Sequence, residues 1–214
     1  MTYLNIMNNV LRRLREEEVT SVSETTYSKM IGDFINDAKS IVEQAADWSA
    51  LRTTLVITTA ASDNQYTLTD SANLVKVMSV INDTQNCFME YQTKDWFNDK
   101  LYISDPVEGA PKYYTFDGLA SGDTQVLVNP TPDGVYSLRF NIVQREGELT
   151  SNTDSLLIPA QPVIHLAVAL AARERGETGG TSTAEYFAIA DKYLSDAIAI
   201  DAAKHPEEMI FRTI

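Results

Sequence analysis

The chain has only two histidines, His165 and His205, and each is a candidate general base or metal ligand. A catalytic imidazole needs a positioned nucleophile beside it and a carboxylate behind it, and no Gly-x-Ser-x-Gly turn or related motif supplies the nucleophile. The two histidines also lack the spacing of a zinc motif. We therefore interpret His165 as a packing residue on an apolar helix, and we predict no catalytic, metal or cofactor site.

Two pairs of aspartates have a one-turn helical spacing, Asp33 with Asp37 and Asp95 with Asp99. Glycosidases need only two carboxylates, and Trp96 beside the second pair is suited to stacking on a sugar ring. However, aspartates on a solvated helix face are the ordinary case, and Asp95 also suits a helix start. A carbohydrate-binding or carbohydrate-cleaving protein therefore stays open as an alternative.

A cluster of charge lies near the N-terminus, where Arg12, Arg13 and Arg15 precede three consecutive glutamates. Such a run is usually a solvated and self-paired helix face. In an assembly the same arginines would bind an acidic neighbour, so they form a candidate interface cluster. The net charge of the whole chain is −13, which argues against nucleic-acid binding through a basic surface.

The last ten residues, 205–214, follow a helix that a His-Pro pair ends. Four large apolar side chains in this segment would be an exposed liability on a free monomer. We predict an extended arm that docks on a partner chain or adds a strand to one. The candidate partner-binding residues of the arm are Met209, Ile210, Phe211 and Ile214.

Helical periodicity dominates both ends of the chain. The sequence predicts a first helix from residue 3 that includes the Arg-Glu run, a second over 26–48, and two more over 163–175 and about 182–204. None of the four apolar stripes can stay exposed, so we predict that two helical hairpins pair as a four-helix bundle. The predicted buried face of the second helix comprises Tyr27, Met30, Ile31, Phe34, Ala38, Ile41, Val42, Ala45 and Trp48.

Between the helices the hydrophobic period changes to two. Stretches rich in Val, Ile, Thr, Tyr and Phe, separated by turn residues, predict six strands, at 53–59, 65–69, 75–81, 111–116, 124–129 and 134–143. A short helical pattern interrupts them at 93–102. We expect a mainly antiparallel block with hairpin-length connections, in which the last strand completes a hairpin.

The predicted fold class is α+β: a four-helix bundle made from N- and C-terminal hairpins, an inserted β-rich lobe and a C-terminal arm. The predicted boundaries are 1–52, 53–158, 159–204 and 205–214. One cysteine, Cys87, excludes an intrachain disulfide. The N-terminus lacks signal-peptide features and the longest apolar run is too short to cross a bilayer, so we expect synthesis in the cytoplasm and no membrane partner.

Three stretches together give the sequence a family resemblance. They are "FINDAKSIVEQAADWSALR" at 34–52, "YTLTD" in the strands, and the segment 128–177, which begins "VNPTPDGVYSLRF" and ends "LAARERGE". In this order, over nearly the whole chain, they resemble the head-to-tail adaptor proteins of tailed bacteriophages. These proteins are also called connector, head-completion or tail-tubular-A-like proteins.

The resemblance implies a structural virion protein at the head–tail junction and no enzyme. Its members form a ring, usually of twelve copies, that binds the portal protein and receives the tail or nozzle proteins. DNA passes through the ring without sequence-specific binding. The resemblance also implies that the helices contact the portal, that the β lobe faces the tail, and that the terminal arm reaches the portal or a neighbouring subunit.

The resemblance supplies no catalytic residue and no cofactor. The alternatives that remain open are a tail-associated carbohydrate-binding or peptidoglycan-degrading protein, and a bacterial accessory protein with the same layout.

Overall fold

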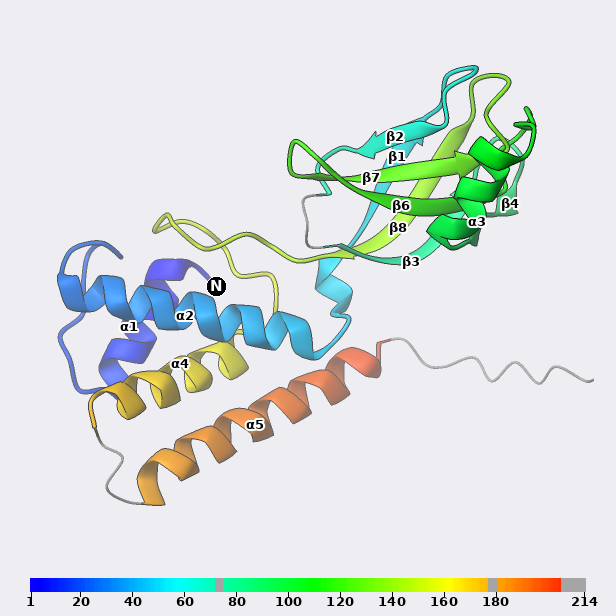
Figure 1. Ribbon diagram of the computed structural model, residues 1–214. Helices are drawn as coiled ribbons and strands as arrows, with labels where there is room; N and C mark the ends of the chain where they lie inside the picture. The colour runs from blue at the N-terminus through cyan, green and yellow to red at the C-terminus, as the bar shows by residue number, and fades with distance from the viewer. Residues whose placement is uncertain (72–74, 177–180, 205–214) are drawn as a thin grey trace, which may run out of the picture. The chain divides into compact units, whose positions relative to one another are not determined.

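The computed structural model describes residues 1–71, 75–176 and 181–204, with side chains omitted at 181–183 (Figure 1). The chain divides into two units. The helical unit combines Met1–Ala50 with the chain from Gly147 onward, and the β unit is Leu51–Glu146. Helices flank a block of strands along the chain, so the fold is α+β, as the sequence predicted.

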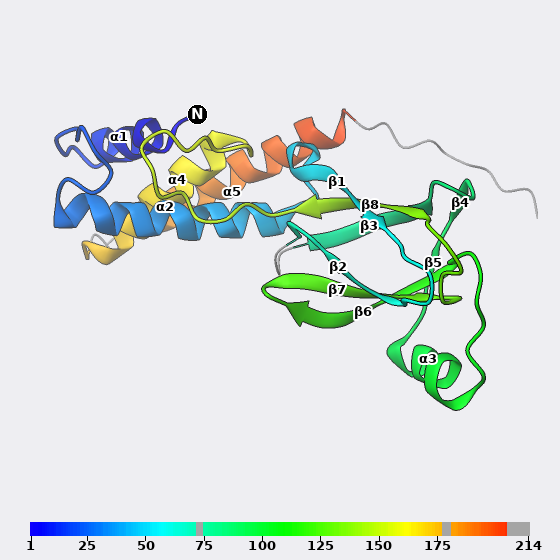
Figure 2. The same ribbon diagram turned by 90° about the horizontal axis from the view of Figure 1, so that it is seen from above.

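Four long helices make up the helical unit, and α4 lies at its centre. This helix packs against each of the other three, and α1 also packs on α2 (Figures 1 and 2). Because α4 is rich in buried alanines, its neighbours can approach closely. The four helices are α1 (Tyr3–Arg13), α2 (Thr26–Ala45), α4 (Ala160–Glu174) and α5 (Thr181–Ala202).

The helix α5 is the least buried of the four. Among its described side chains, from residue 184 on, Ala190 alone is buried, and Ile189 and Ile200 are 42% and 68% exposed. These contacts do not establish the closed four-helix bundle that the sequence predicted. They show three helices that share a core and a fourth helix that packs along α4.

The first helix is shorter than the sequence predicted: α1 ends at Arg13, so Arg12 and Arg13 are helical and the rest of the Arg-Glu run, residues 14–18, lies in the following loop. Arg15 has a φ of 59°, in the left-handed region through which a right-handed helix cannot continue. The N–H of Glu16 instead donates to the Leu11 carbonyl at 2.9 Å, which closes the last turn. The prediction of a helix was therefore confirmed as far as Arg13 and wrong for residues 14–18.

The second helix begins where it was predicted, because Thr25 and Ser28 form a reciprocal capping box. Its buried face differs from the prediction: Ile41 is 49% exposed, whereas Lys39 and Glu43 are buried. A side chain at Gly32 would overlap the Tyr3 hydroxyl, so α1 approaches α2 closely there. The buried residues of α2 are Ser28, Ile31, Gly32, Ile35, Ala38, Lys39, Val42 and Glu43.

The β unit contains two four-stranded sheets that face each other (Figure 2). The first has the order β1-β8-β3-β4 and is antiparallel. The second has the order β2-β7-β6-β5, and its β5–β6 pair is parallel. The strands are β1 (Arg52–Thr58), β2 (Gln65–Leu68), β3 (Val75–Asn82), β4 (Cys87–Phe88), β5 (Glu90–Tyr91), β6 (Tyr113–Ala120), β7 (Asp123–Asn129) and β8 (Ser137–Gln144).

The core of the β unit lies between the two sheets. Phe140 of β8 is fully buried there, and Tyr114 of the opposite sheet meets it edge-on with ring centroids 6.1 Å apart. Alternate residues of each strand supply this core, as the period of two requires. Its buried residues are Ile57, Leu68, Val80, Met89, Tyr114, Val126, Val128, Leu138, Phe140 and Ile142.

Two predictions about the strands need correction. The strand β8 does not complete a hairpin with β7, because it pairs with β1 and β3 at the centre of the other sheet. The strand β7 instead forms a hairpin with β6, and Ser121 and Gly122 in its turn have positive φ, as tight hairpin turns require. The short strands β4 and β5 were not predicted. Between β5 and β6 the chain forms α3 (Lys94–Asn98) and the π-helix η2 (Asp99–Ile103).

Residues 147–158, which the sequence analysis assigned to the β lobe, belong to the helical unit. The carbonyl of Asp154 accepts the N–H of Tyr3 at 2.8 Å, so this segment caps the start of α1. On α2, the Asn36 side chain makes two hydrogen bonds to the backbone of Leu149, at 2.9 and 3.1 Å. The returning chain is therefore an integral part of the helical unit.

Candidate interaction site

The helical unit carries a pocket of about 370 Å³ between the start of α4 and the C-terminal half of α5. Its apolar lining includes Tyr193 and Ile200, which are 40% and 68% exposed. The residues that line the pocket are Pro159, Gln161, Pro162, Tyr193, Asp196, Ala197, Ile200, Asp201 and Lys204. Exposed apolar side chains around a concavity are typical of a binding site rather than of a bare surface.

The C-terminal end of this pocket is fixed by a polar network around Asp201. One carboxylate oxygen accepts the backbone N–H of Ser49 at 2.8 Å, and the other accepts the Ser49 hydroxyl at 2.6 Å and Lys204 Nζ at 3.0 Å. Burial raises the pKa of Asp201, but the bonds from Ser49 and Lys204 outweigh it and lower the pKa to about 2. The ionised carboxylate thereby ties the end of α5 to the chain that follows α2.

His165 lies where α1, α4 and α5 meet. Its ring stacks on Tyr193 with centroids 4.2 Å apart and planes 12° from parallel, and Arg13 Nη1 lies 2.7 Å from Nε2. Burial and the Arg13 charge both lower the pKa of His165, which favours the neutral imidazole. This environment fits the packing role predicted from the sequence.

The three arginines of the candidate interface cluster have separate environments. Arg12 forms an exposed ion pair with Glu18 at 2.7 Å, which contributes little to stability. Arg13 contacts His165, and Arg15 is exposed with no ion pair among the residues that the structure describes. These arginines therefore do not share one acidic partner within the chain.

A fourth arginine, which the sequence analysis did not single out, does hold the loop after α1. Arg175, at the end of α4, pairs with Glu16 and donates to the Leu14 carbonyl at 3.2 Å. Its guanidinium also lies over the Tyr27 ring, 5.0 Å from the centroid. The glutamate run therefore has a structural partner from α4.

The candidate arm residues Met209, Ile210, Phe211 and Ile214 lie outside the described residues, as does His205. The description of the chain ends at Lys204, which is itself part of the pocket lining.

The aspartate pairs of the enzyme alternative do not form an enclosed site. All four carboxylate residues are exposed, and Asp99 pairs with Lys100 at 3.5 Å. Trp96 packs against Tyr113, with ring centroids 4.9 Å apart, and is part of a small aromatic cluster instead of an open stacking platform. Within residues 1–71, 75–176 and 181–204, no group of three metal-ligating side chains comes together.

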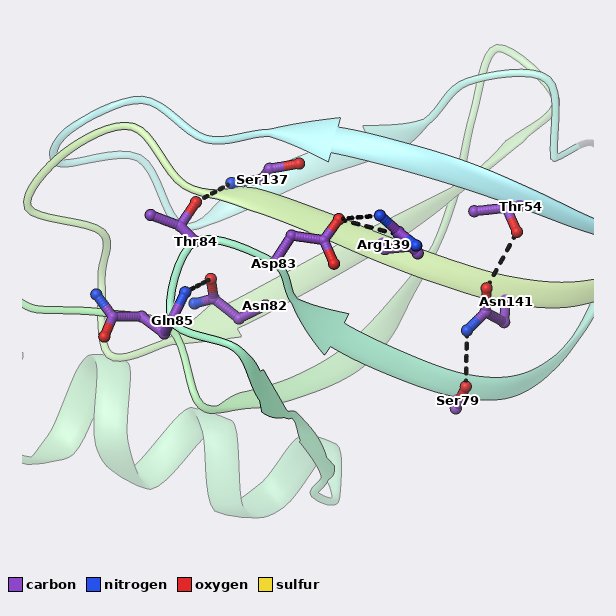
Figure 3. Close-up of polar contacts among 9 residues, drawn as sticks. All are labelled: Thr54, Ser79, Asn82, Asp83, Thr84, Gln85, Ser137, Arg139 and Asn141. Carbon is purple, nitrogen blue, oxygen red and sulfur yellow. Dashed lines mark hydrogen bonds and ion pairs between the residues drawn. The ribbon is translucent and has the colours of Figure 1, made fainter.

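The outer face of the first sheet in the β unit carries a polar ladder (Figure 3). Asn141 of β8 accepts from Thr54 of β1 and donates to Ser79 of β3, both at 3.0 Å. Arg139, on the same strand, pairs with Asp83 at 2.9 Å. These groups satisfy one another across three strands, so the ladder leaves few of its own polar groups to recognise a ligand.

Sequence comparison identifies the family. A family model described as SU10 adaptor protein matches residues 1–208 and so covers both units. The chain belongs to the SU10 adaptor family. This assignment agrees with the resemblance to phage head-to-tail adaptors and makes the chain a structural component of the virion. A search of curated proteins found no match.

The SU10 adaptor family is a family of structural phage proteins and is not known for enzymatic activity. Membership implies association with the portal and the tail in the virion. No helix in the described part of this adaptor is long and apolar enough to cross a membrane.

Sequence reasoning missed the pocket, although a signal for it was present. In the sequence of the last helix one apolar stripe is evident, and one stripe alone indicates one buried face: Phe187, Ala190, Leu194, Ala197 and Ile198. A second stripe at helical spacing, Ile189, Tyr193 and Ile200, indicates another apolar face. That second stripe is the exposed one in this adaptor.

Proposed function

We propose that this adaptor is a subunit of a ring that binds the portal and joins it to the tail. By family resemblance the proposed ring is a dodecamer. The ring forms part of the channel through which DNA leaves the capsid. The observation that carries the proposal is the family match over 1–208, which includes both the helical and the β unit. The proposed mechanism is assembly, driven by burial of apolar surface between subunits.

The open side of α5 supports a subunit interface in the helical unit. Near its start this helix exposes Ala184, Ala188 and Ile189, where a solvated helix would carry charged residues. We propose that a neighbouring copy covers this surface in the ring. The same contact would complete the bundle that α1, α2 and α4 leave open.

The charge of the chain supports the channel role. Each copy carries a net charge of −13, so a ring of many copies is strongly acidic. Acidic walls repel the DNA backbone and let the duplex slide without binding to bases. The proposal therefore includes DNA passage without sequence-specific recognition.

Two sets of residues are proposed as partner contacts. The apolar arm residues Met209, Ile210 and Phe211, with Ile214, are proposed to bind the portal or a neighbouring subunit. Of the arginine cluster, Arg15 is the best placed to meet an acidic neighbour, because it is exposed and Arg13 is already engaged with His165. The helical unit would carry these contacts, and the β unit would face the tail.

The test is assembly with the purified portal protein of the same phage. We expect electron microscopy and analytical ultracentrifugation to show rings of this adaptor on portal rings, and Ile189→Asp to prevent their formation without unfolding the chain. The matched control is Ile41→Asp on α2, which changes an isoleucine of similar exposure and should assemble normally. A chain that binds no portal, alone or in mixtures with tail proteins, would contradict the proposed function.

A further inference from the structure

The pocket between α4 and α5 needs an occupant that is mostly apolar. Pro159, Pro162 and Ala197 contribute to its lining together with Tyr193 and Ile200, and Ile200 is 68% exposed. Burial of apolar side chains is favourable, so an occupant that covers this surface would be stabilised by each side chain that it removes from water. Three charged side chains also line the pocket: Asp196, Asp201 and Lys204, of which the last two pair with each other at 3.0 Å.

The segment that continues from the pocket has the matching chemistry. Residues 205–214 follow Lys204 directly and read His-Pro-Glu-Glu-Met-Ile-Phe-Arg-Thr-Ile. They supply three consecutive large apolar residues at 209–211, which match the apolar lining, and Arg212, which matches Asp196. We propose that this segment folds back and docks in the α4–α5 pocket of its own chain.

The spacing along the chain agrees with such a return. Residues 205–208 form a four-residue unit with proline at its second position, which is the favoured place for proline in a reverse turn. After that turn, extended residues 209–212 span about 10 Å at about 3.3 Å per residue. The helical lining from Lys204 back to Ala197 also spans about 10 Å, at 1.5 Å per residue.

The proposed register would place Phe211 opposite Ile200 and Ala197 of the lining, with Arg212 near Asp196. The turn is short, so the effective concentration of the arm at its own pocket is about 1 mM. The arm of a second copy, present at micromolar concentration, therefore competes poorly for the pocket. The docking is a property of the isolated chain and does not depend on the proposed ring. In an assembly, any partner that takes up the arm must first displace it from this pocket.

The proposal is tested with a fluorescent peptide of residues 205–214 and full-length chains, by fluorescence anisotropy. In wild type the pocket is filled by its own arm. In Phe211→Asp the arm loses its central apolar group and the pocket becomes free. Suppose that the free pocket of Phe211→Asp binds the peptide with a dissociation constant of about 0.1 mM. In wild type the arm competes at about 1 mM, so the apparent dissociation constant should be about tenfold higher.

A matched pair of variants locates the binding. In the Phe211→Asp background, Ile200→Asp should abolish peptide binding, whereas Ile189→Asp should leave it unchanged. Both isoleucines are exposed on the same face of α5, three turns apart, and only Ile200 lines the pocket. Circular dichroism confirms that each variant is folded.

Three outcomes would overturn the proposal. Equal peptide binding by wild type and Phe211→Asp would mean that the arm does not occupy the pocket. No peptide binding by Phe211→Asp would mean that the pocket does not recognise this segment. Concentration-dependent dimers of wild type that Ile200→Asp abolishes, seen by analytical ultracentrifugation, would assign the pocket to the arm of a second copy. Loss of portal binding alone would affect the proposed function and leave this docking intact.

Discussion

The two units of this adaptor differ in how completely they bury their apolar surface. In the β unit, two sheets enclose one core, and the polar groups on the outer face of the first sheet bond to one another. In the helical unit, α5 leaves a second apolar stripe and a pocket exposed. The difference suggests that the β unit is complete as a folding unit, whereas the helical unit has surface that binding must cover.

The largest expected effect is the loss of a core ring in the β unit. Phe140→Ala removes a fully buried phenyl ring between the sheets and should destabilise that unit by about 4 kcal/mol. Urea denaturation followed by the near-ultraviolet signal measures this change. Phe88→Ala is the control, because Phe88 is 73% exposed and its loss should change stability by less than about 0.5 kcal/mol. Similar losses for the two variants would contradict the assignment of the core.

The next effect concerns the buried ion pair of the helical unit. Lys39 and Glu43 lie 2.7 Å apart with side chains 3% and 2% exposed, and Lys39 also donates to the Gly147 carbonyl at 2.9 Å. Lys39→Met leaves a buried carboxylate without its cation and should cost about 3 kcal/mol in the free energy of unfolding.

The double variant Lys39→Met/Glu43→Leu is the matched control for that prediction. It removes both charges together, so it should recover most of the loss. A double variant as unstable as the single one would show that the Gly147 hydrogen bond, rather than the ion pair, holds the segment in place.

A smaller effect is expected at the end of α5. Asp201→Asn removes the charge that binds Ser49 and Lys204 and should cost about 1 kcal/mol. The folded pKa of about 2 lies below the ordinary value of 3.8, so the contribution is complete above about pH 4 and is lost as the pH falls toward 2. Unfolding curves across this range should show a shallower acid loss in the variant than in wild type.

The smallest effect is the titration of His165, whose pKa is lowered by burial and by Arg13. Because the unfolded chain binds the proton more readily, this contribution to stability is complete above the ordinary pKa of 6.5 and declines as the pH falls below it. Thermal unfolding at pH 7.5 and 5.5 checks the direction. His165→Phe keeps the stacking on Tyr193 and should remove this part of the pH dependence.

The elements of the fold follow largely from sequence periodicity. Alternating residues predicted the six longer strands, because one face of each strand lies in the core and the other does not. The alternation of apolar and polar residues does not indicate which strands pair with each other. For this reason β8 was predicted to be part of a hairpin, whereas it lies at the centre of the other sheet. Strands of two residues, such as β4, are too short to show a period.

The missed features depend on contacts that are remote in sequence. Lys39 and Glu43 have the spacing of an ordinary solvated pair, and they are buried beside a returning segment more than a hundred residues away. The second half of the Arg-Glu run also has good helix formers, yet it is a loop in which Arg175, from the end of α4, pairs with Glu16. For the interaction site, the sequence predicted an apolar arm but not a pocket on the same chain.

The pairing of β1 with β8 brings the two ends of the β unit together. Arg52 and Val143 are partners in the ladder, so the chain passes into the β unit and out of it through neighbouring strands. A unit whose two ends lie side by side can be replaced by another of any length without stretching the helices that flank it. Insertions into the β unit or replacements of it therefore need not disturb the helices on either side.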